Sequence, residues 1–511
     1  MQRGSFARHR FADIAAGLLA AGSVGAIGLY LAVALLRLRY PFELEWMEGG
    51  AVDHVARILD GRQLYLAPSI DFVPFVYPPL YFYLSAALAK AIGLGFLPLR
   101  LVSLASSLAC LALLFRIVAR ETGCRRAGLC AAGLYAATFA ASGAWFDLAR
   151  VDSLFVALLL GGLERLRFGD RSAGGSIAAG VLLAMAFLAK QTALPIAVAV
   201  LLHAVLTHRK HVWPATAAFV LAAALPALAI EFASRGWYSY YVFRLPGQHP
   251  LDGKWITFFS RDLLRTVPLA GLISAVFLAW QALRPRRPES HRPRITVYLV
   301  FLVTSVAASY ASRLHEAGYL NVLMPAFAAL SLVTGLAVGT VMSTTADPAK
   351  TAWGQMGRGA VGLVCLLQLL LLAYNPRPLV PTVADRQAGE ALVRRLAALP
   401  GEVYIPFHGY LAVLAGKPTH AQGMAVYDVL RGENPQSGAL AASLDQAIRD
   451  QRFAAVVLDS NLFLPQLTRY YRLTGTVFDR SSVFFPVTGK RTRPEQILTP
   501  AYAATTTVAT P

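Results

Sequence analysis

Three glutamates, Glu43, Glu45 and Glu48, lie within six positions of one another, directly after the first long apolar stretch. A carboxylate held in a cavity can act as a general base and take the proton of an attacking hydroxyl. Glu48 precedes an amphipathic stretch, where a helix dipole would keep a carboxylate ionised. The spacing does not single out one glutamate, and an acid that only begins a surface helix is the simpler alternative.

Two other groups of ionisable residues stand at the ends of apolar runs. Asp152 comes immediately before the run 153–163, and Arg150 lies two residues earlier. Asp152 could be a buried functional carboxylate or a helix N-cap, and Arg150 could pair with Asp147 or with a ligand phosphate. Lys190 lies between two apolar runs, where it could anchor a span end by reaching toward water or bind an anion.

A further pair, Arg313 and His315, follows the apolar run 295–311. Both side chains could hold a phosphate, and the alternative is a charge cluster at a membrane interface. The four cysteines form no CxxC pair, so neither a disulfide nor a metal site is predicted from them. No metal ligand is predicted elsewhere, although Glu48 and Asp152 could together hold a divalent ion.

The elements that must position these residues are membrane helices. The chain has 511 residues, of which 56% are hydrophobic and 15% are charged, against about 25% charged residues in soluble proteins. The first apolar run, 14–36, is long enough to cross a membrane and is predicted to be an uncleaved first span. The net charge of +19 falls mostly in short loops between apolar runs. That distribution indicates membrane orientation and argues against nucleic acid as a partner.

Orientation follows from clusters of basic residues, which favour the cytoplasmic side. Four such clusters occur, at 116–126, 165–171, 208–210 and 284–294. With a cytoplasmic N-terminus, all four are cytoplasmic only if the apolar run 80–94 does not cross, so it is predicted to be interfacial or re-entrant. About eleven spans and an external C-terminus result. All the candidate residues then gather on the non-cytoplasmic side, where ionisable groups at membrane depth usually line a cavity or do chemistry.

The chain changes character after Asn375. Three prolines between 376 and 381 indicate a linker, and strand-like runs at 403–405 and 454–458 accompany a helix-like stretch at 384–399. The predicted organisation is an α-helical polytopic membrane domain over 1–375, with a first external loop at 40–79. A small external α/β domain follows over 376–498, and an Ala- and Thr-rich, disordered tail over 499–511.

Together these motifs resemble the GT-C superfamily of glycosyltransferases that depend on polyprenyl-phosphate sugars. The likeness is greatest to a bacterial group that includes lipid A aminoarabinose transferases and protein O-mannosyltransferase-like proteins. Glu48, in Glu48-Gly49-Gly50, stands where family members carry an acid at the start of a juxtamembrane helix. They usually have Asp-Glu there, so Glu45 is the reserve. The segment Tyr77-Pro78-Pro79-Leu80-Tyr81 is similar to the family's PPLY segment.

Two later motifs extend the resemblance. Ala149-Arg150-Val151-Asp152 looks like the family's second acidic motif, and Leu188-Ala189-Lys190-Gln191 looks like its phosphate-side lysine motif. The resemblance covers about residues 45–321 and implies a GT-C-like fold. It implies catalytic roles for Glu48, Asp152 and Glu45. The substrate-binding residues that it implies are Lys190, Arg150, Arg313, His315, Arg57 and Tyr81.

The chemistry implied by the resemblance is transfer of a sugar from a polyprenyl-phosphate donor to a lipid, glycan or protein acceptor, with inversion and without a cofactor. The expected location is a bacterial inner membrane, with the reaction on its outer side. Two other classes of function remain open. A transporter of lipid-linked sugars would be favoured by inverted repeats, and none is evident. A non-catalytic membrane scaffold would be compatible with Glu-Gly in place of Asp-Glu.

Overall fold

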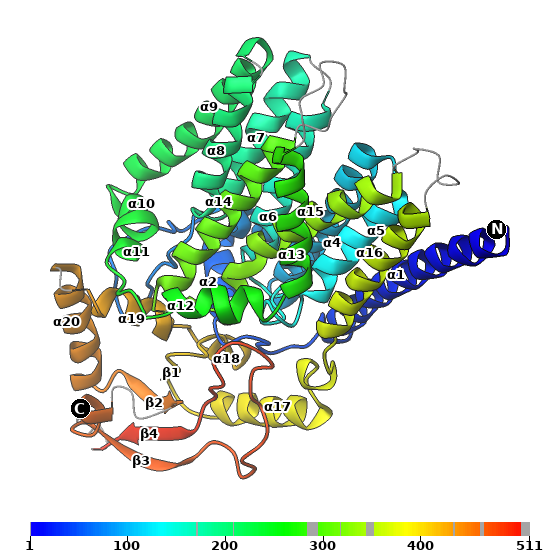
Figure 1. Ribbon diagram of the computed structural model, residues 1–511. Helices are drawn as coiled ribbons and strands as arrows, with labels where there is room; N and C mark the ends of the chain where they lie inside the picture. The colour runs from blue at the N-terminus through cyan, green and yellow to red at the C-terminus, as the bar shows by residue number, and fades with distance from the viewer. Residues whose placement is uncertain are drawn as a thin grey trace, which may run out of the picture.

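The computed structural model describes residues 2–169, 172–207, 209–283, 295–316, 318–343, 352–432, 435–459 and 464–501. Helices dominate up to residue 371, and a small four-stranded sheet lies in the C-terminal part. Figure 1 shows the helical bundle above this C-terminal part, with the first helix along one edge of the bundle. Three of the predicted basic clusters are affected by gaps in the described residues: 284–294 lies wholly outside them, and the clusters at 208–210 and 165–171 lie partly outside them.

The first nine helices run to residue 233. They are α1 (Gln2–Arg37), α2 (Glu48–Leu59), α3 (Leu80–Ile92), α4 (Phe96–Thr122), α5 (Arg125–Ala137), α6 (Asp152–Phe168), α7 (Ala173–Ala189), α8 (Ala193–Thr207) and α9 (Arg209–Ala233). Glycines in backbone conformations that other residues avoid end two of them, with φ of 93° at Gly93 after α3 and 69° at Gly123 after α4. Gly180 of α7 lets α9 approach closely, because an added Cβ would lie 2.0 Å from the Ala215 carbonyl oxygen.

Short helices follow α9: α10 (Trp237–Ser239), the π-helix η1 (Tyr240–Arg244), α11 (Leu245–Gly247), α12 (Trp255–Thr257) and the π-helix η2 (Phe258–Leu264). The last long helices of the bundle are α13 (Pro268–Leu283), α14 (Ile295–Leu314), α15 (Met324–Ser343) and α16 (Ala352–Leu371), and the 3-10 helix η3 (Leu320–Leu323) directly precedes α15. Helix α15 is buried along most of its length and forms the centre of the bundle.

By length and apolar composition, five helices among the described residues can cross a membrane: 11–37, 96–122, 212–233, 295–314 and 320–343. A sixth span is possible if Trp255–Leu264 and Pro268–Leu283, which meet at 95°, are one bent span. Four apolar helices are shorter, and α3 is among them. Its 13 residues extend about 20 Å, less than the roughly 30 Å hydrocarbon core. This length agrees with the non-crossing prediction for 80–94, while the total of about eleven spans stays a prediction.

The C-terminal part combines helices with a mixed sheet, as expected for an α/β domain. Its elements are η4 (Arg377–Leu379), α17 (Val383–Ala397), β1 (Glu402–Tyr404), α18 (Tyr410–Leu414), α19 (Gly423–Leu430), α20 (Pro435–Arg449), β2 (Phe453–Leu458), α21 (Leu464–Leu467), β3 (Tyr471–Thr476) and β4 (Gln496–Pro500). The strand order is β1-β2-β4-β3, with β1 parallel to β2 and the other pairs antiparallel.

Two local features fix this domain. A capping box begins α17, in which Thr382 and Asp385 accept hydrogen bonds from each other's backbone N–H groups. A separate apolar core between α17 and the sheet includes Leu396, Val403 and Val457. The predicted tail, 499–511, overlaps the end of β4, because Thr499 and Pro500 pair with β3. Residues 502–511 lie outside the described residues.

Candidate active site

One cavity of about 790 Å³ lies between the helical bundle and the C-terminal domain. The bundle side is lined by residues of the first external loop, of the turns before α6 and α8, and of the segments around 246–254 and 312–322. The C-terminal domain contributes Phe407, residues of α19 and the segment at 489–490. Groups from eight separate stretches of the chain therefore face a single space, which is how binding sites of helical bundles are commonly built.

Glu45 is the acid of the first loop that lines this cavity. Its side chain is fully buried, and its Oε2 accepts a hydrogen bond of 3.2 Å from the Met47 N–H. Oε1 accepts none from the described residues. Burial raises the pKa of Glu45 to about 8, against the opposing effect of Arg150. A buried carboxylate with one free oxygen and a raised pKa has the properties of a general base.

Arg150 lies beside Glu45 and lines the same cavity. Its Nη1 is 3.7 Å from Glu45 Oε2, and its Nη2 donates to the Tyr77 hydroxyl at 3.1 Å. Both Nε and Nη1 are buried without a hydrogen-bond partner among the described residues. Because an unsatisfied buried guanidinium is costly, these two nitrogens indicate a place for an anionic ligand.

Lys190 and Asp152 form a buried ion pair at the cavity wall. Lys190 is the residue that follows α7, and its Nζ lies 2.6 Å from Asp152 Oδ1. The same oxygen accepts a hydrogen bond of 2.9 Å from the Asn321 amide. Asp152 Oδ2 accepts from the Trp145 indole at 2.9 Å. Lys190, Trp145 and Asn321 line the cavity, whereas Asp152 does not. Asp152 is thus placed to position Lys190. Because Asp152 does not line the cavity, its position does not support the catalytic role expected for Asp152.

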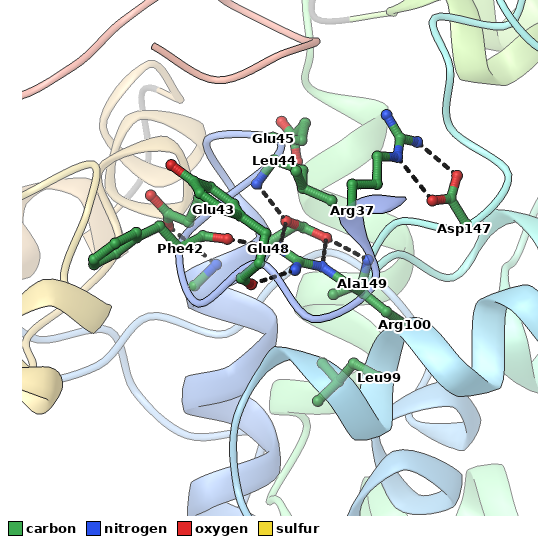
Figure 2. Close-up of polar contacts among 12 residues, drawn as sticks. Arg37, Phe42, Glu43, Leu44, Glu45, Glu48, Leu99, Arg100, Asp147 and Ala149 are labelled. Atoms are coloured by element: carbon green, nitrogen blue, oxygen red, sulfur yellow. Dashed lines mark hydrogen bonds and ion pairs between the residues drawn. The ribbon is translucent and has the colours of Figure 1, made fainter. Parts of the chain in front are cut away.

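Glu48 lies outside the cavity lining, in contrast to the expectation that it would face a ligand. As Figure 2 shows, both of its oxygens are engaged: by Arg100, by the Leu44 N–H at 2.7 Å and by the Ala149 N–H at 2.7 Å. Glu48 and Arg100 are both fully buried. Burial opposes ionisation, but Arg100 and these N–H groups outweigh it and lower the pKa of Glu48. This geometry indicates that Glu48 has a structural role, as the ion-pair partner of Arg100.

A second buried ion pair supports the same region. Arg37, the last residue of α1, donates to both oxygens of Asp147 (Figure 2). It also donates to the Ala144 carbonyl at 2.7 Å. Asp147 is therefore the partner of Arg37, and Arg150 remains available to the cavity. The two pairs, Arg37–Asp147 and Arg100–Glu48, fix the turn that carries Arg150 against the loop that carries Glu45.

Arg313 and His315 both line the cavity, as expected for substrate-binding residues. Arg313 is already engaged, because its Nε donates to Asp262 Oδ2 at 2.8 Å and its Nη1 donates to the Gly318 carbonyl. His315 Nδ1 has no partner among the described residues. Burial, and then Arg431, lower the pKa of His315, so the neutral imidazole is favoured there.

Two expected substrate-binding residues lie elsewhere. Arg57 is at the exposed end of α2, where its Nε donates to the Gln63 carbonyl and its guanidinium stacks on Phe72. Tyr81 is fully buried in α3 and its hydroxyl contacts the Leu99 carbonyl and Ser103. Neither lines the cavity. Both predictions relied on positions inside recognisable motifs, but helix periodicity turns these two side chains away from the space that Glu45 and Arg150 face.

The structure also brings in residues that sequence reasoning missed. Trp46, Arg431 and Lys490 line the cavity, and the last two come from the C-terminal domain. No local pattern marks them, because only the docking of that domain brings them to the site. Within the described ranges, no group of three or more His, Cys, Asp or Glu side chains is arranged to hold a metal ion.

Comparison with known proteins places this geometry in a wider context. The family described as dolichyl-phosphate-mannose-protein mannosyltransferase matches residues 76–234. The structure is similar to ArnT from Cupriavidus metallidurans bound to undecaprenyl phosphate. That similarity has a TM-score of 0.55 and 14% identity, over 94% of this chain and 98% of that one. It is also similar to the arabinofuranosyltransferase AftD from Mycobacteria, with a TM-score of 0.51 and 14% identity, over 93% of this chain and 41% of that one. No curated protein matches significantly.

The fold that this chain shares with these two structures is a bundle with several apolar helices, followed here by a C-terminal part with a four-stranded sheet. The family match covers 76–234, and the likeness to the two solved structures is one of fold. The stretch 76–234 that matches the mannosyltransferase family contains Arg150, Asp152 and Lys190, so this match and the cavity geometry concern the same residues.

Proposed function

We propose that the protein transfers a sugar from a polyprenyl-phosphate donor to an acceptor outside the cytoplasm. The observation that carries this proposal is that one cavity holds a buried carboxylate and a buried guanidinium, with one oxygen and two nitrogens that have no hydrogen-bond partner among the described residues. These groups are Glu45 Oε1 and Arg150 Nε and Nη1. The first can take a proton and the second can stabilise a leaving phosphate, which are the two tasks of such a transfer.

The donor phosphate is proposed to bind between Arg150 and Lys190. Both cations line the cavity, and the Lys190 ammonium is held in position by Asp152. Undecaprenyl phosphate, the lipid bound in the similar ArnT structure, is a ligand of this kind. A cavity at membrane level allows the lipid tail to stay among apolar surroundings while the phosphate reaches the cations.

In the proposed reaction, the acceptor hydroxyl attacks the anomeric carbon of the donor sugar. The new oxygen–carbon bond forms as the bond from that carbon to the phosphate oxygen breaks, through an oxocarbenium-like transition state. The hydroxyl proton goes to Glu45, and the bonding electron pair leaves with the polyprenyl phosphate, whose charge Arg150 and Lys190 stabilise. One displacement inverts the anomeric configuration. We propose no metal ion, because these two cations already supply positive charge at the leaving group.

The location is proposed to be a bacterial inner membrane with the cavity on the outer side. Arg116 and Arg120 of α4 lie at the opposite end of this helix from Arg100, which contacts the first external loop. The separation of 20 residues between Arg100 and Arg120 corresponds to about 30 Å of helix. Basic residues favour the cytoplasmic side, so a cytoplasmic Arg120 supports an external cavity. The acceptor is proposed to be a lipid, glycan or protein.

The test is the lipid content of cells that lack the protein. We expect one polyprenyl-phosphate sugar to accumulate, and the wild-type chain to remove it when restored. A chain with Arg150→Ala should fail to remove the lipid although it is present in the membrane. If no lipid-linked sugar accumulates, or if Arg150→Ala restores the normal level, the proposed function is wrong. Turnover of the accumulated lipid by purified protein then separates a transferase from a transporter, which would leave the lipid unchanged.

A further inference from the structure

The basic side chains of the cavity differ in whether a carboxylate balances them. Six line it among the described residues: Arg150, Lys190, Lys254, Arg313, Arg431 and Lys490. Five of these have a carboxylate oxygen within 3.7 Å. Lys490 has no ion-pair partner within the described ranges, and its ammonium instead lies 5.6 Å from the Trp46 ring centre and 5.7 Å from that of Phe407. An uncompensated cation on a cavity wall is suited to an anionic ligand.

The segment that carries Lys490 is attached directly to the loop that carries Glu45. The N–H groups of Val487 and Thr488 both donate to the Leu44 carbonyl, at 3.0 and 3.2 Å. Thr488 pairs with Glu45 as a short parallel bridge, and its hydroxyl donates to the Gly143 carbonyl. The segment 487–490 is therefore held from two sides, and it lies in the C-terminal domain but belongs structurally to the site.

Gly489 brings the two segments into close contact. Its φ is 79°, and a Cβ added there would lie 3.1 Å from Glu45 Oε1 and 2.9 Å from Glu45 Cγ. The backbone at Gly489, next to Lys490, thus lies against the Glu45 carboxylate, which also pairs with Arg150. A phosphate bound near Glu45 would lie between Arg150 and Lys490. The Lys490 side chain is exposed, so it can move toward a ligand without disturbing packed neighbours.

We propose that Lys490 binds the phosphate of the lipid-linked donor, so that the C-terminal domain forms part of the donor site. This inference rests on the proposed function, because it takes the same ligand to the same cavity. The Trp46 and Phe407 rings hold the ammonium near the cavity by cation–π contacts while the ligand is absent. When a phosphate enters, the ammonium exchanges these contacts for a charge-assisted hydrogen bond, which is stronger.

The test measures binding of undecaprenyl phosphate to the purified full-length protein in nanodiscs. Lys490→Ala should raise Kd by about tenfold, the effect of losing one charged hydrogen bond, and Lys490→Arg should retain most of the affinity. Arg472→Ala is the matched control, because Arg472 is an exposed cation on β3 of the same domain and does not line the cavity. It should leave Kd unchanged. Arg150→Ala provides the reference for a cation of the proposed donor site.

The outcomes separate the two proposals. If the wild type binds the lipid and Arg150→Ala weakens binding while Lys490→Ala does not, the role of Lys490 is wrong and the proposed function stands. If Lys490→Ala and Arg472→Ala weaken binding equally, the effect is one of general charge and the proposal is also wrong. If the wild type does not bind undecaprenyl phosphate at all, both the proposed function and this inference are overturned.

Discussion

Replacing Glu45 by glutamine tests the proposed base directly. The amide keeps the size of the carboxylate and an oxygen for the Met47 N–H, which donates to Glu45 at 3.2 Å. It loses the basic oxygen that has no partner among the described residues. General-base help is worth about 10²–10⁴-fold in rate, or about 3–5 kcal/mol of activation free energy. We expect kcat to fall by this factor, with little change in stability.

Glu48→Gln is the matched comparison, since it makes the same chemical change three residues away. Glu48 is the carboxylate partner of the fully buried Arg100, and breaking a buried pair by removing one partner costs about 3–5 kcal/mol. The amide nitrogen would also oppose one of the N–H donors of Leu44 and Ala149. This variant should therefore unfold more readily, while the protein that remains folded should retain turnover.

The assay follows sugar release from a polyprenyl-phosphate donor by each purified variant, with the folded fraction measured in the same sample. The reasoning is refuted if Glu45→Gln turns over like the wild type. It is equally refuted if Glu48→Gln is fully folded but inactive, because that result would return the base to Glu48. The pH dependence provides an independent readout. The deprotonated form of Glu45 is the active one and its pKa is raised to about 8, so kcat/KM should rise with pH up to about 8 and then level.

Three other predictions concern the surroundings of the site. Lys190→Met should weaken binding of undecaprenyl phosphate by about tenfold or more, measured by titration in nanodiscs. Gly489→Ala should cost about 1–2 kcal/mol of stability and also lower kcat by displacing Glu45. Gly416 has a φ of 74°, and a Cβ added there would meet no described residue within 4 Å, so Gly416→Ala should show the stability loss without the loss of kcat. His408 is buried, which opposes its charge, but two carboxylates raise its pKa to about 10. Its stabilisation is full below the unfolded pKa of about 6.5 and is lost as pH rises through 10, so His408→Gln should flatten the decline of Tm over that range.

The sequence alone determined the class of structure and the general region of the site. Long apolar runs and a low charge content required membrane helices, because a bilayer leaves no other way to satisfy the backbone of such segments. The motifs around Arg150 and Lys190 marked two cations that do line the cavity. The α/β character of the C-terminal part was also predictable, because strand and helix patterns there are local and short in range.

Only the tertiary structure decided which acid faces the cavity. Glu45 and Glu48 are three positions apart and chemically alike, so their roles depend on what packs against them. Glu48 is paired with Arg100, whereas Glu45 lies beside Arg150 at the cavity wall. The same holds for Lys490, more than 400 residues from Glu45 in the sequence. It reaches the site because the segment 487–490 pairs with the first external loop. Long-range pairing and burial of this kind leave no local signal, since they are properties of contacts between distant segments.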